Sequence, residues 1–294
     1  MKNKLPLLIG NSFFSKMAEK EAKLAEVPGA VCPNNDSPIR FEIIQEKLKR
    51  GDDTKEPRII PLLMSNLIGV NRSINSIKEN PSHPKTEIDK RLYGELEEYA
   101  YSLDVCSIGY TRLPAQWVFQ NKAALHSNVI VLTMKMDREA INTSPSPDAE
   151  YTVIATYRDL GIIANKVADF LRKHGFSAQA GHPLNGQTLY PPLAQLAGLG
   201  QLGYSGLIIT PEYGPCVRLS AIYTSIENLP FNKGNEHTWV TDYCASCGLC
   251  IKQCPAEAIY AEPIRHESGR ITYVDNDKCF PYFHYNHGLS LIHI

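Results

Sequence analysis

The chain has 294 residues, of which 43% are hydrophobic and 21% are charged, and its formal net charge at pH 7 is −1. This composition indicates a globular protein of one large or two modest domains, and the near-neutral charge argues against nucleic acid as the main partner. No apolar run is long enough to cross a membrane, and the N-terminus has neither an Arg-Arg pair nor a small-residue cleavage pattern, so we expect a cytoplasmic protein without a membrane partner.

Residues 1–89 are predicted to form an N-terminal extension of mixed character, which includes a charged, helix-like stretch from Phe41 to Lys49. The pattern becomes regular at Lys90, where a new domain is expected to begin. Leucine and tyrosine side chains then recur at helical spacing through Leu103, which predicts a helix.

A β-rich run, NVIVLTMKM at residues 128–136, predicts a buried strand, and TSPSPDAE at 143–150 predicts a loop. An apolar stripe from Ile163 to Leu171 then predicts a helix that ends at Gly175. A further short helix is expected over residues 192–197.

Two strand-like segments, GLIIT at 206–210 and VRLSAIYT at 217–224, flank the turn PEYGP, and this arrangement predicts a β-hairpin. NLPFNKGNEH, which follows, predicts a linker into a cysteine-rich region at 233–288.

Four cysteines in that region have the spacing Cys244-x2-Cys247-x2-Cys250-x3-Cys254, followed by a proline that is expected to start a short helix over 256–260. In two-cluster ferredoxins the first three cysteines of such a run hold one [4Fe–4S] cluster and the fourth holds the other. A zinc site usually separates its cysteine pairs more widely, and a redox C-x-x-C motif needs no third and fourth cysteine. The run therefore predicts iron–sulfur clusters.

The second cluster needs further thiolates, and after Cys254 the sequence offers Cys279 in DKCFPYF. The sequence then ends at residues 289–294, LSLIHI, which resemble the translation of a sequencing adapter. We therefore expect a truncated cluster domain, with a native continuation that carries a C-x2-C-x3-C-P run. The lone cysteines Cys32 and Cys106 are expected to be structural.

The stretch GLGQLG at 198–203 matches the dinucleotide-binding fingerprint literally. That fingerprint follows a strand and opens a helix, whereas here it follows a predicted helix and leads into a predicted strand. The glycines indicate that the backbone turns sharply or closely approaches another group. A packing role and a ligand-binding role both remain open.

AGLGQLGYSGLIITPEYGP, then VRLSAIYT, the cysteine run and CFPYF, resemble the corrinoid and iron–sulfur reductases, which include reductive dehalogenases and epoxyqueuosine reductases. The resemblance extends over about residues 90–288. It implies an α/β (α+β) fold, with a nitroreductase-like corrinoid-binding domain at 90–232 and a two-[4Fe–4S] ferredoxin-like module at 233–288. The implied cofactors are cobalamin and [4Fe–4S] clusters.

The resemblance also implies roles for individual residues. ATYRDLGIIANKVADFLRKHGFSA is similar to the dehalogenase segment that carries a proton-donating tyrosine, which here is Tyr157, and Asn185 falls at the position of a residue that assists it. His182 is expected to be a hydrogen-bonded loop residue and not a cobalt ligand. The dehalogenase GPRVR stands here as GPCVR, with Cys216 in place of the first arginine, which puts the substrate in question. The residues expected to bind the corrinoid are Gly198, Gly200, Gly203, Gly206, Thr210, Tyr213 and Gly214.

The favoured hypothesis is a cobalamin-dependent iron–sulfur reductase that acts on a small organic substrate, such as an organohalide, and receives electrons from a ferredoxin or flavodoxin-like donor. The first alternative is an epoxyqueuosine reductase-like enzyme that acts on tRNA. The region lacks the general-acid aspartate of those enzymes, which favours the dehalogenase branch. The second alternative is a ferredoxin-like electron carrier without a corrinoid.

Overall fold

The computed structural model describes residue 17, residues 19–38 and residues 57–285. The predicted helical stretch from Phe41 to Lys49 and the adapter-like tail at 289–294 lie outside the described residues.

The centre of the molecule is a four-stranded antiparallel sheet with the strand order β1-β2-β6-β3. Strands β2 and β6 occupy the middle, and their residues are almost all buried because both faces of the sheet are covered. The predicted strand at 128–136 is thereby confirmed. The bounds are β1, Ser107–Arg112; β2, Asn128–Lys135; β3, Ala178–Gly181; and β6, Val217–Thr224.

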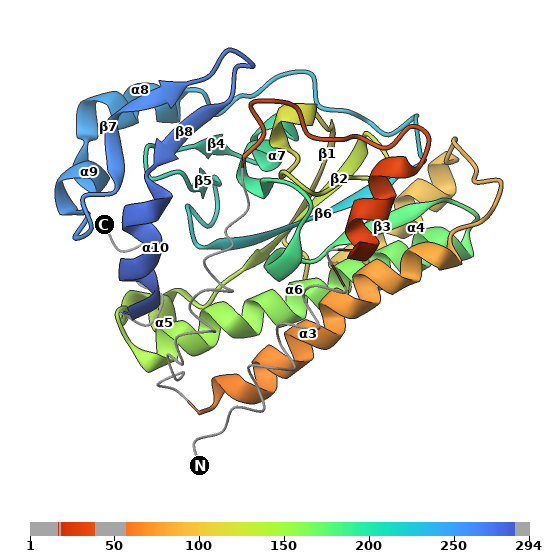
Figure 1. Ribbon diagram of the computed structural model, residues 1–294, viewed down its shortest axis with the longest axis horizontal. Coiled ribbons are helices and arrows are strands. Elements are labelled where there is room, and N and C mark those ends of the chain that lie inside the picture. The colour runs from red at the N-terminus through yellow and green to blue at the C-terminus, as the bar shows by residue number, and fades with distance from the viewer. Residues whose placement is uncertain (1–16, 18, 39–56, 286–294) are drawn as a thin grey trace.

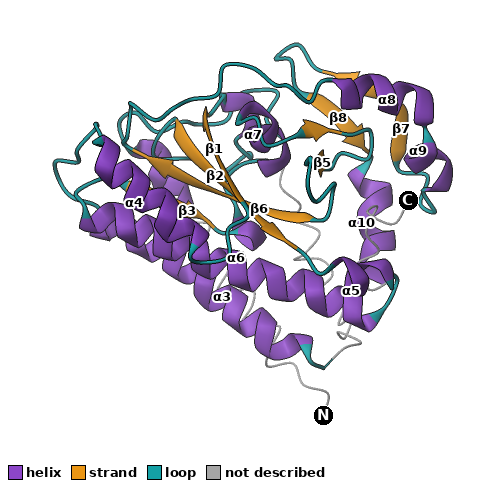
Figure 2. Cartoon of the chain, turned by 180° about the vertical axis from the view of Figure 1, so that it is seen from behind, coloured by secondary structure: helices purple, strands orange, loops and turns teal. Residues whose placement is uncertain are grey.

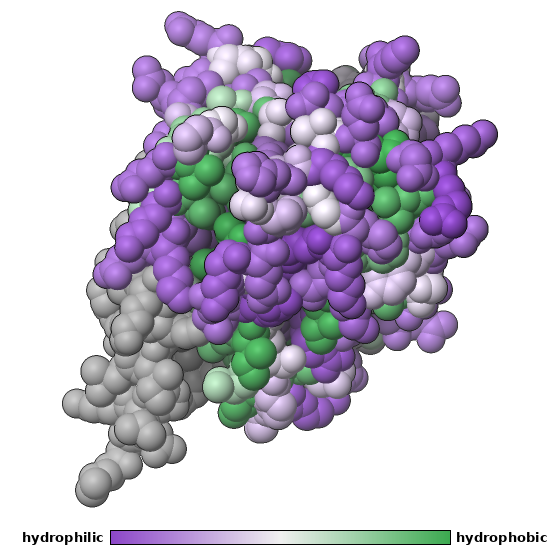
Figure 3. Space-filling view, turned by 90° about the vertical axis from the view of Figure 1, so that its right-hand side faces the viewer, coloured by the Kyte–Doolittle hydropathy of each residue, from purple (hydrophilic) through white to green (hydrophobic). Residues whose placement is uncertain are grey.

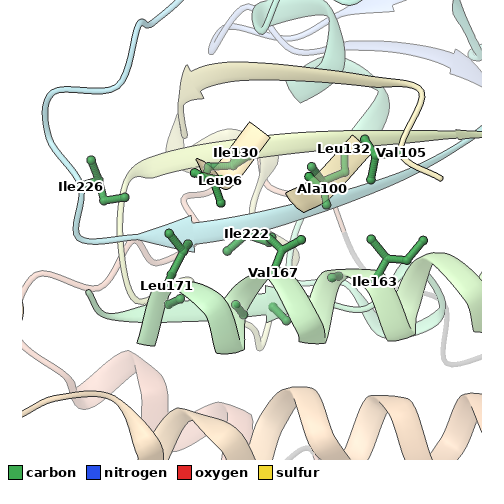
Figure 4. Close-up of a cluster of buried hydrophobic side chains, with 14 of the residues drawn as sticks. Leu96, Ala100, Val105, Ile130, Leu132, Ile163, Val167, Leu171, Ile222 and Ile226 are labelled. Carbon is green, nitrogen blue, oxygen red and sulfur yellow. The ribbon is translucent and has the colours of Figure 1, made fainter. Parts of the chain in front are cut away.

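Helices cover the two faces of this sheet unequally. Helix α6 (Pro147–Lys173) packs on one face beside α3 (Ile59–Asn75) and α4 (Lys90–Tyr101), whereas α7 (Tyr190–Leu196) packs on the other. Figures 1 and 2 show α3 and α6 side by side beneath the sheet. Between α6 and the sheet, Ile163, Val167 and Leu171 point toward Ile222 (Figure 4). The mixed helix and strand fold expected from the sequence is confirmed.

Helix α6 begins one residue after Ser146, whose Oγ accepts a hydrogen bond from the backbone N–H of Ala149 at 3.1 Å. Pro147 occupies the first turn, where its missing N–H costs no hydrogen bond. The loop predicted over 143–150 therefore ends at Ser146, and the second half of that segment is helical. At the other end Gly175, with φ of +90°, ends the helix as predicted.

The hairpin predicted from GLIIT and VRLSAIYT is wrong. Strand β5 (Ile208–Ile209) pairs with β4 (Gln201–Leu202), whereas β6 belongs to the central sheet. Thr210 and Gly214 form two backbone hydrogen bonds of 2.9 Å with each other, which close a small loop between β5 and β6. The chain then continues into the central sheet and does not pair with β5.

The cysteine-rich region begins after residues 228–237, which contain no helix or strand, as predicted for a linker. A short helix over 256–260 was also predicted, and this is wrong. Residues 255 and 256 form a turn, Glu257 has φ of +48°, and Ile259 pairs with Val274 in β7. The elements are α8, Trp239–Cys247; α9, Leu249–Gln253; β7, Ile259–Arg265; β8, Ile271–Val274; and α10, Asn276–Tyr285.

The remaining helical elements are α5, Arg138–Asn142; η1, Lys23–Glu26; η2, Ser76–Glu79; η3, Ala115–Trp117; and η4, Pro183–Asn185. The face shown in Figure 3 is mostly polar, with apolar side chains in small patches. Among the described residues, no helix combines the length and apolar character that a membrane crossing requires.

Candidate functional site

The first three cysteines of the run lie around the junction of α8 and α9. Gly248 joins the two helices in the left-handed conformation, with φ of +59°, so the chain turns sharply between Cys247 and Cys250. Burial raises the pKa of the Cys250 thiol, and the neighbouring Cys244 and Cys247 raise it further.

The fourth cysteine belongs to a second group. Cys254 is buried and packs with Cys279 of α10, where burial and the nearby Cys254 raise the pKa of the Cys279 thiol. Cys250 of the first group packs against the same apolar cluster, so the two groups adjoin. In two-cluster ferredoxins the first three cysteines of such a run and the fourth serve different clusters.

The described side chains contain no group of three His, Cys, Asp or Glu residues close enough to hold one metal ion. A cubane cluster holds its thiolates on separate iron atoms, so they stand farther apart than the ligands of a single ion.

The glycine-rich stretch after α7 lies against the first cysteine group. A Cβ atom at Gly200 would stand 2.3 Å from the carbonyl oxygen of Ile209, so packing alone requires glycine there. A Cβ atom at Gly203 would stand 3.7 Å from the Sγ atom of Cys244. This stretch follows a helix and leads into β4, so its context differs from that of a dinucleotide-binding loop, as predicted.

The small loop from Thr210 to Gly214 contacts Arg138 of α5. The Thr210 hydroxyl donates to the Gly214 carbonyl at 3.0 Å, and the Tyr213 carbonyl accepts from Nη2 of Arg138 at 3.1 Å. Arg138 also interacts with the thiol of Cys216, whose pKa is raised by burial. Four of the predicted corrinoid-binding residues are glycines with positive φ values: Gly198 (+76°), Gly200 (+159°), Gly206 (+77°) and Gly214 (+57°).

Tyr157 lies half-buried on α6, in an apolar cluster that includes Cys216. The guanidinium of Arg218 lies over its ring, 4.0 Å from the ring centre. Nε of Arg218 is buried and has no hydrogen-bond partner among the described residues. No motif pointed to Arg218, although it is the arginine that remains in GPCVR, two residues after Cys216 on β6.

Asn185 lies at the end of η4, 5% exposed, and its Nδ2 donates to Oε1 of Glu21 at 3.1 Å. Glu21 in turn forms a buried ion pair with Lys122. Among the described residues no hydrogen bond joins Asn185 to Tyr157, so these two predicted residues belong to separate sets of polar contacts. No sequence motif indicated a role for Glu21, which is far from Asn185 along the chain.

His182 is buried between α3 and α6. Its Nδ1 accepts the backbone N–H of Leu184 at 3.1 Å, as expected for a hydrogen-bonded loop histidine, but its Nε2 has no hydrogen-bond partner among the described residues. Burial lowers the pKa of His182 to about 4, so the ring is neutral at pH 7.

Comparison with known proteins identifies the cysteine run. The family model "4Fe-4S binding domain" matches residues 237–260, which include the first four predicted ligands. The cysteine-rich region is therefore a 4Fe–4S binding sequence, as predicted.

Longer stretches of the chain are similar to parts of two kinds of enzyme. A tetrachloroethene reductive dehalogenase of Desulfitobacterium hafniense is 36% identical over 172 residues, which are 54% of this chain and 30% of that protein. The epoxyqueuosine reductase of Listeria monocytogenes is 35% identical over 88 residues, which are 30% of this chain and 22% of that protein. The chain thus spans less than a third of the dehalogenase that it matches. The resemblance predicted from the motifs is confirmed.

Solved structures share the fold. A structure described as a reductive dehalogenase with a mechanism for B12-dependent dehalogenation aligns with a TM-score of 0.62 and 17% identity, over 75% of this chain and 34% of that one. The catabolic reductive dehalogenase NpRdhA in complex with 3-bromo-4-hydroxybenzoic acid aligns with a TM-score of 0.66 and 17% identity, over 93% and 38%.

Proposed function

We propose that this chain is the cofactor-binding part of a cytoplasmic iron–sulfur reductase of the reductive dehalogenase type, in which clusters pass electrons to a corrinoid. The similarity to dehalogenases and the 4Fe–4S sequence support this proposal. All eight cysteines are free thiols, which suits a reducing compartment.

One observation carries the proposal. A continuous run of contacts joins the cluster cysteines to the candidate proton donor: Gly203 lies against Cys244, the loop ending at Gly214 lies against Arg138, and Cys216 packs against Tyr157. The electron source and the proton source therefore border one segment, residues 200–216. A redox cofactor that works between them is expected to bind along this segment.

The fit of a corrinoid to this segment rests on its open positions. A Cβ atom at Gly214 would meet only Nη2 of Arg138, at 3.9 Å, so space remains beside this residue, whereas Gly200 is accounted for by packing. Within the part of the chain that the structure describes, the buried Nε of Arg218 is a donor without a partner, and buried donors of this kind usually bind a ligand or water. When bound, a reduced corrinoid supplies a strong nucleophile or one-electron donor.

The chain's own residues supply the remaining parts of a reduction. The Tyr157 hydroxyl can deliver a proton to the reduced substrate, as a positioned general acid. The positive charge of Arg218 over the ring favours the negative charge that remains on Tyr157 after the transfer. Asn185 is proposed to assist from η4, where Glu21 holds its side chain.

The proposed substrate is a small organohalide, and the proposed electron donor is a reduced ferredoxin or flavodoxin-like protein. The replacement of an arginine by Cys216 removes one positive charge and leaves a smaller side chain at this position, while Arg138 and Arg218 remain beside it.

Turnover with a chemical reductant tests the function. Protein reconstituted with iron, sulfide and hydroxocobalamin is offered tetrachloroethene, halogenated phenols and an epoxyqueuosine-bearing RNA. Release of halide ion from one of the organohalides supports the proposal. Reduction of the RNA alone would identify the enzyme as an epoxyqueuosine reductase, and reduction of none of them, with intact clusters, would contradict the proposed function.

A further inference from the structure

A buried carboxylate from the N-terminal segment lies beside the candidate site. Glu21 is only 1% exposed, and its side chain forms an ion pair with Lys122. The same carboxylate accepts Nδ2 of Asn185 at 3.1 Å and Nε2 of Gln187 at 3.4 Å. Four polar side chains, all buried or nearly so, therefore meet at one point.

The chemistry of these groups determines how the two amides are oriented. An ionised carboxylate only accepts hydrogen bonds, so Asn185 and Gln187 must both present their NH₂ groups to Glu21. The Oδ1 atom of Asn185 then faces away from Glu21. A group that could both donate and accept would not impose this orientation.

The turn that carries Asn185 is anchored on its other side by His182. The imidazole lies so close to α6 that a Cβ atom at Gly161 would stand 2.1 Å from its Nε2. The His182 carbonyl accepts the backbone N–H of Asn185 at 3.0 Å. Gly161 lies one helical turn after Tyr157, so His182 connects the turn to the helix of the candidate proton donor.

We propose that Glu21 is a positioning residue of the candidate site, which holds the turn at residues 182–188 and orients the Asn185 amide. The proposal rests on the proposed function only where it concerns turnover. Segment 19–26, at the start of the chain, then belongs to the site as a structural part. Lys122 pairs with the Glu21 carboxylate within the protein interior, where an isolated charge is strongly disfavoured.

Hydrogen exchange tests the positioning without reference to activity. The test variant is Glu21→Gln/Lys122→Gln, which removes both charges together and leaves neither ion buried alone, as Glu21→Gln by itself would. We expect backbone amides at 184–189 to exchange about tenfold faster in the reconstituted variant, while the central sheet keeps its protection. Glu26→Gln, the same change at an exposed position of the same segment, is the matched control. Unchanged exchange at 184–189, or equal acceleration throughout the protein, would overturn the proposal.

A double-mutant cycle on turnover tests whether Glu21 acts through Asn185. Asn185→Ala and the Glu21/Lys122 variant are each expected to lower kcat, and their combination is expected to lower it no further than the stronger one alone. Multiplying effects would overturn action through Asn185. If no substrate is turned over at all, the proposed function fails, while the exchange experiment still decides whether Glu21 holds the turn.

Discussion

At the scale of single residues, Tyr157 and Arg218 form the best-defined pair in the candidate site. We predict that Tyr157→Phe keeps its iron and corrinoid content and loses turnover by roughly 10²-fold or more, as expected when a general acid is removed. The assay uses a chemical reductant, so that no donor protein limits the rate. Tyr151→Phe is the matched control, because Tyr151 is an exposed tyrosine on α6 that also lies beneath an arginine. Parental turnover by Tyr157→Phe would show that the proton comes from another group, and Tyr213 is then the next residue to test.

Two histidines, the buried His182 and the half-buried His126, give stability a defined pH dependence. Burial lowers the pKa of both His126 and His182 from 6.5 to about 4. The unfolded chain therefore binds more protons than the folded chain between these values, and stability falls as pH decreases from about 6.5 to about 4. Each histidine contributes about 3 kcal/mol to this loss.

We predict that His126→Gln reduces the difference in the free energy of unfolding between pH 7 and pH 5 by about 2 kcal/mol, as measured with urea. The same substitution at the exposed His83 is expected to leave that difference unchanged. An undiminished difference in His126→Gln would show that His126 does not cause it.

At the scale of secondary-structure elements, the sequence predicted well where local patterns decide the structure. The helix from Lys90, the strand at 128–136 and the end of α6 at Gly175 follow from apolar spacing and capping residues. The hairpin at PEYGP was wrong because strand pairing is decided by partners far along the chain, here β2 and β3, which a local pattern does not reveal.

The candidate site also combines residues that local motifs indicate with residues that only the fold brings together. Tyr157 and the cluster cysteines were identified from motifs, whereas Glu21 and Arg218 become visible only when folding brings distant segments together. No spacing rule connects Glu21 with Asn185, because their contact depends on how the N-terminal segment packs against η4.

The junction of α3, α6 and η4 depends on two glycines that admit the His182 ring. We predict that Gly161→Ala destabilises the protein by several kcal/mol, because its Cβ atom would stand 2.1 Å from Nε2 of His182. Replacing His182 with alanine in the same chain is expected to restore part of the loss. Gly94→Ala, in α4 with no atom near the added methyl, is expected to be neutral or stabilising by up to about 1 kcal/mol. Equal thermal midpoints for Gly161→Ala and the parent protein would contradict this packing.

At the scale of the whole molecule, the N-terminal residues connect parts that the sequence suggested were separate. The predicted extension, residues 1–89, includes α3, which packs along α6 of the proposed corrinoid domain. Asp36 accepts the backbone N–H of Ser268 in the turn between β7 and β8, at 2.8 Å. The segment before α3 thus contacts both the central sheet region and the cluster region.

The division of the cysteines into two groups makes a specific prediction for the clusters. Cys254→Ser and Cys279→Ser are expected to alter one and the same cluster, and Cys247→Ser the other, as read from the electron paramagnetic resonance of the reduced protein. Cys32→Ser, outside both groups, is expected to leave both signals unchanged. The assignment would be wrong if Cys254→Ser and Cys279→Ser altered different signals.

The central claim is that this chain holds a corrinoid next to its iron–sulfur clusters, and retention of cobalt tests it most directly. Protein reconstituted with iron, sulfide and hydroxocobalamin is freed of unbound cofactor by gel filtration, and its iron and cobalt are then measured by atomic emission. The account predicts about one cobalt per chain together with iron. Loss of Cys247 is expected to lower the iron and leave the cobalt in place. Iron without cobalt in the parent protein would contradict the account and identify an electron carrier instead.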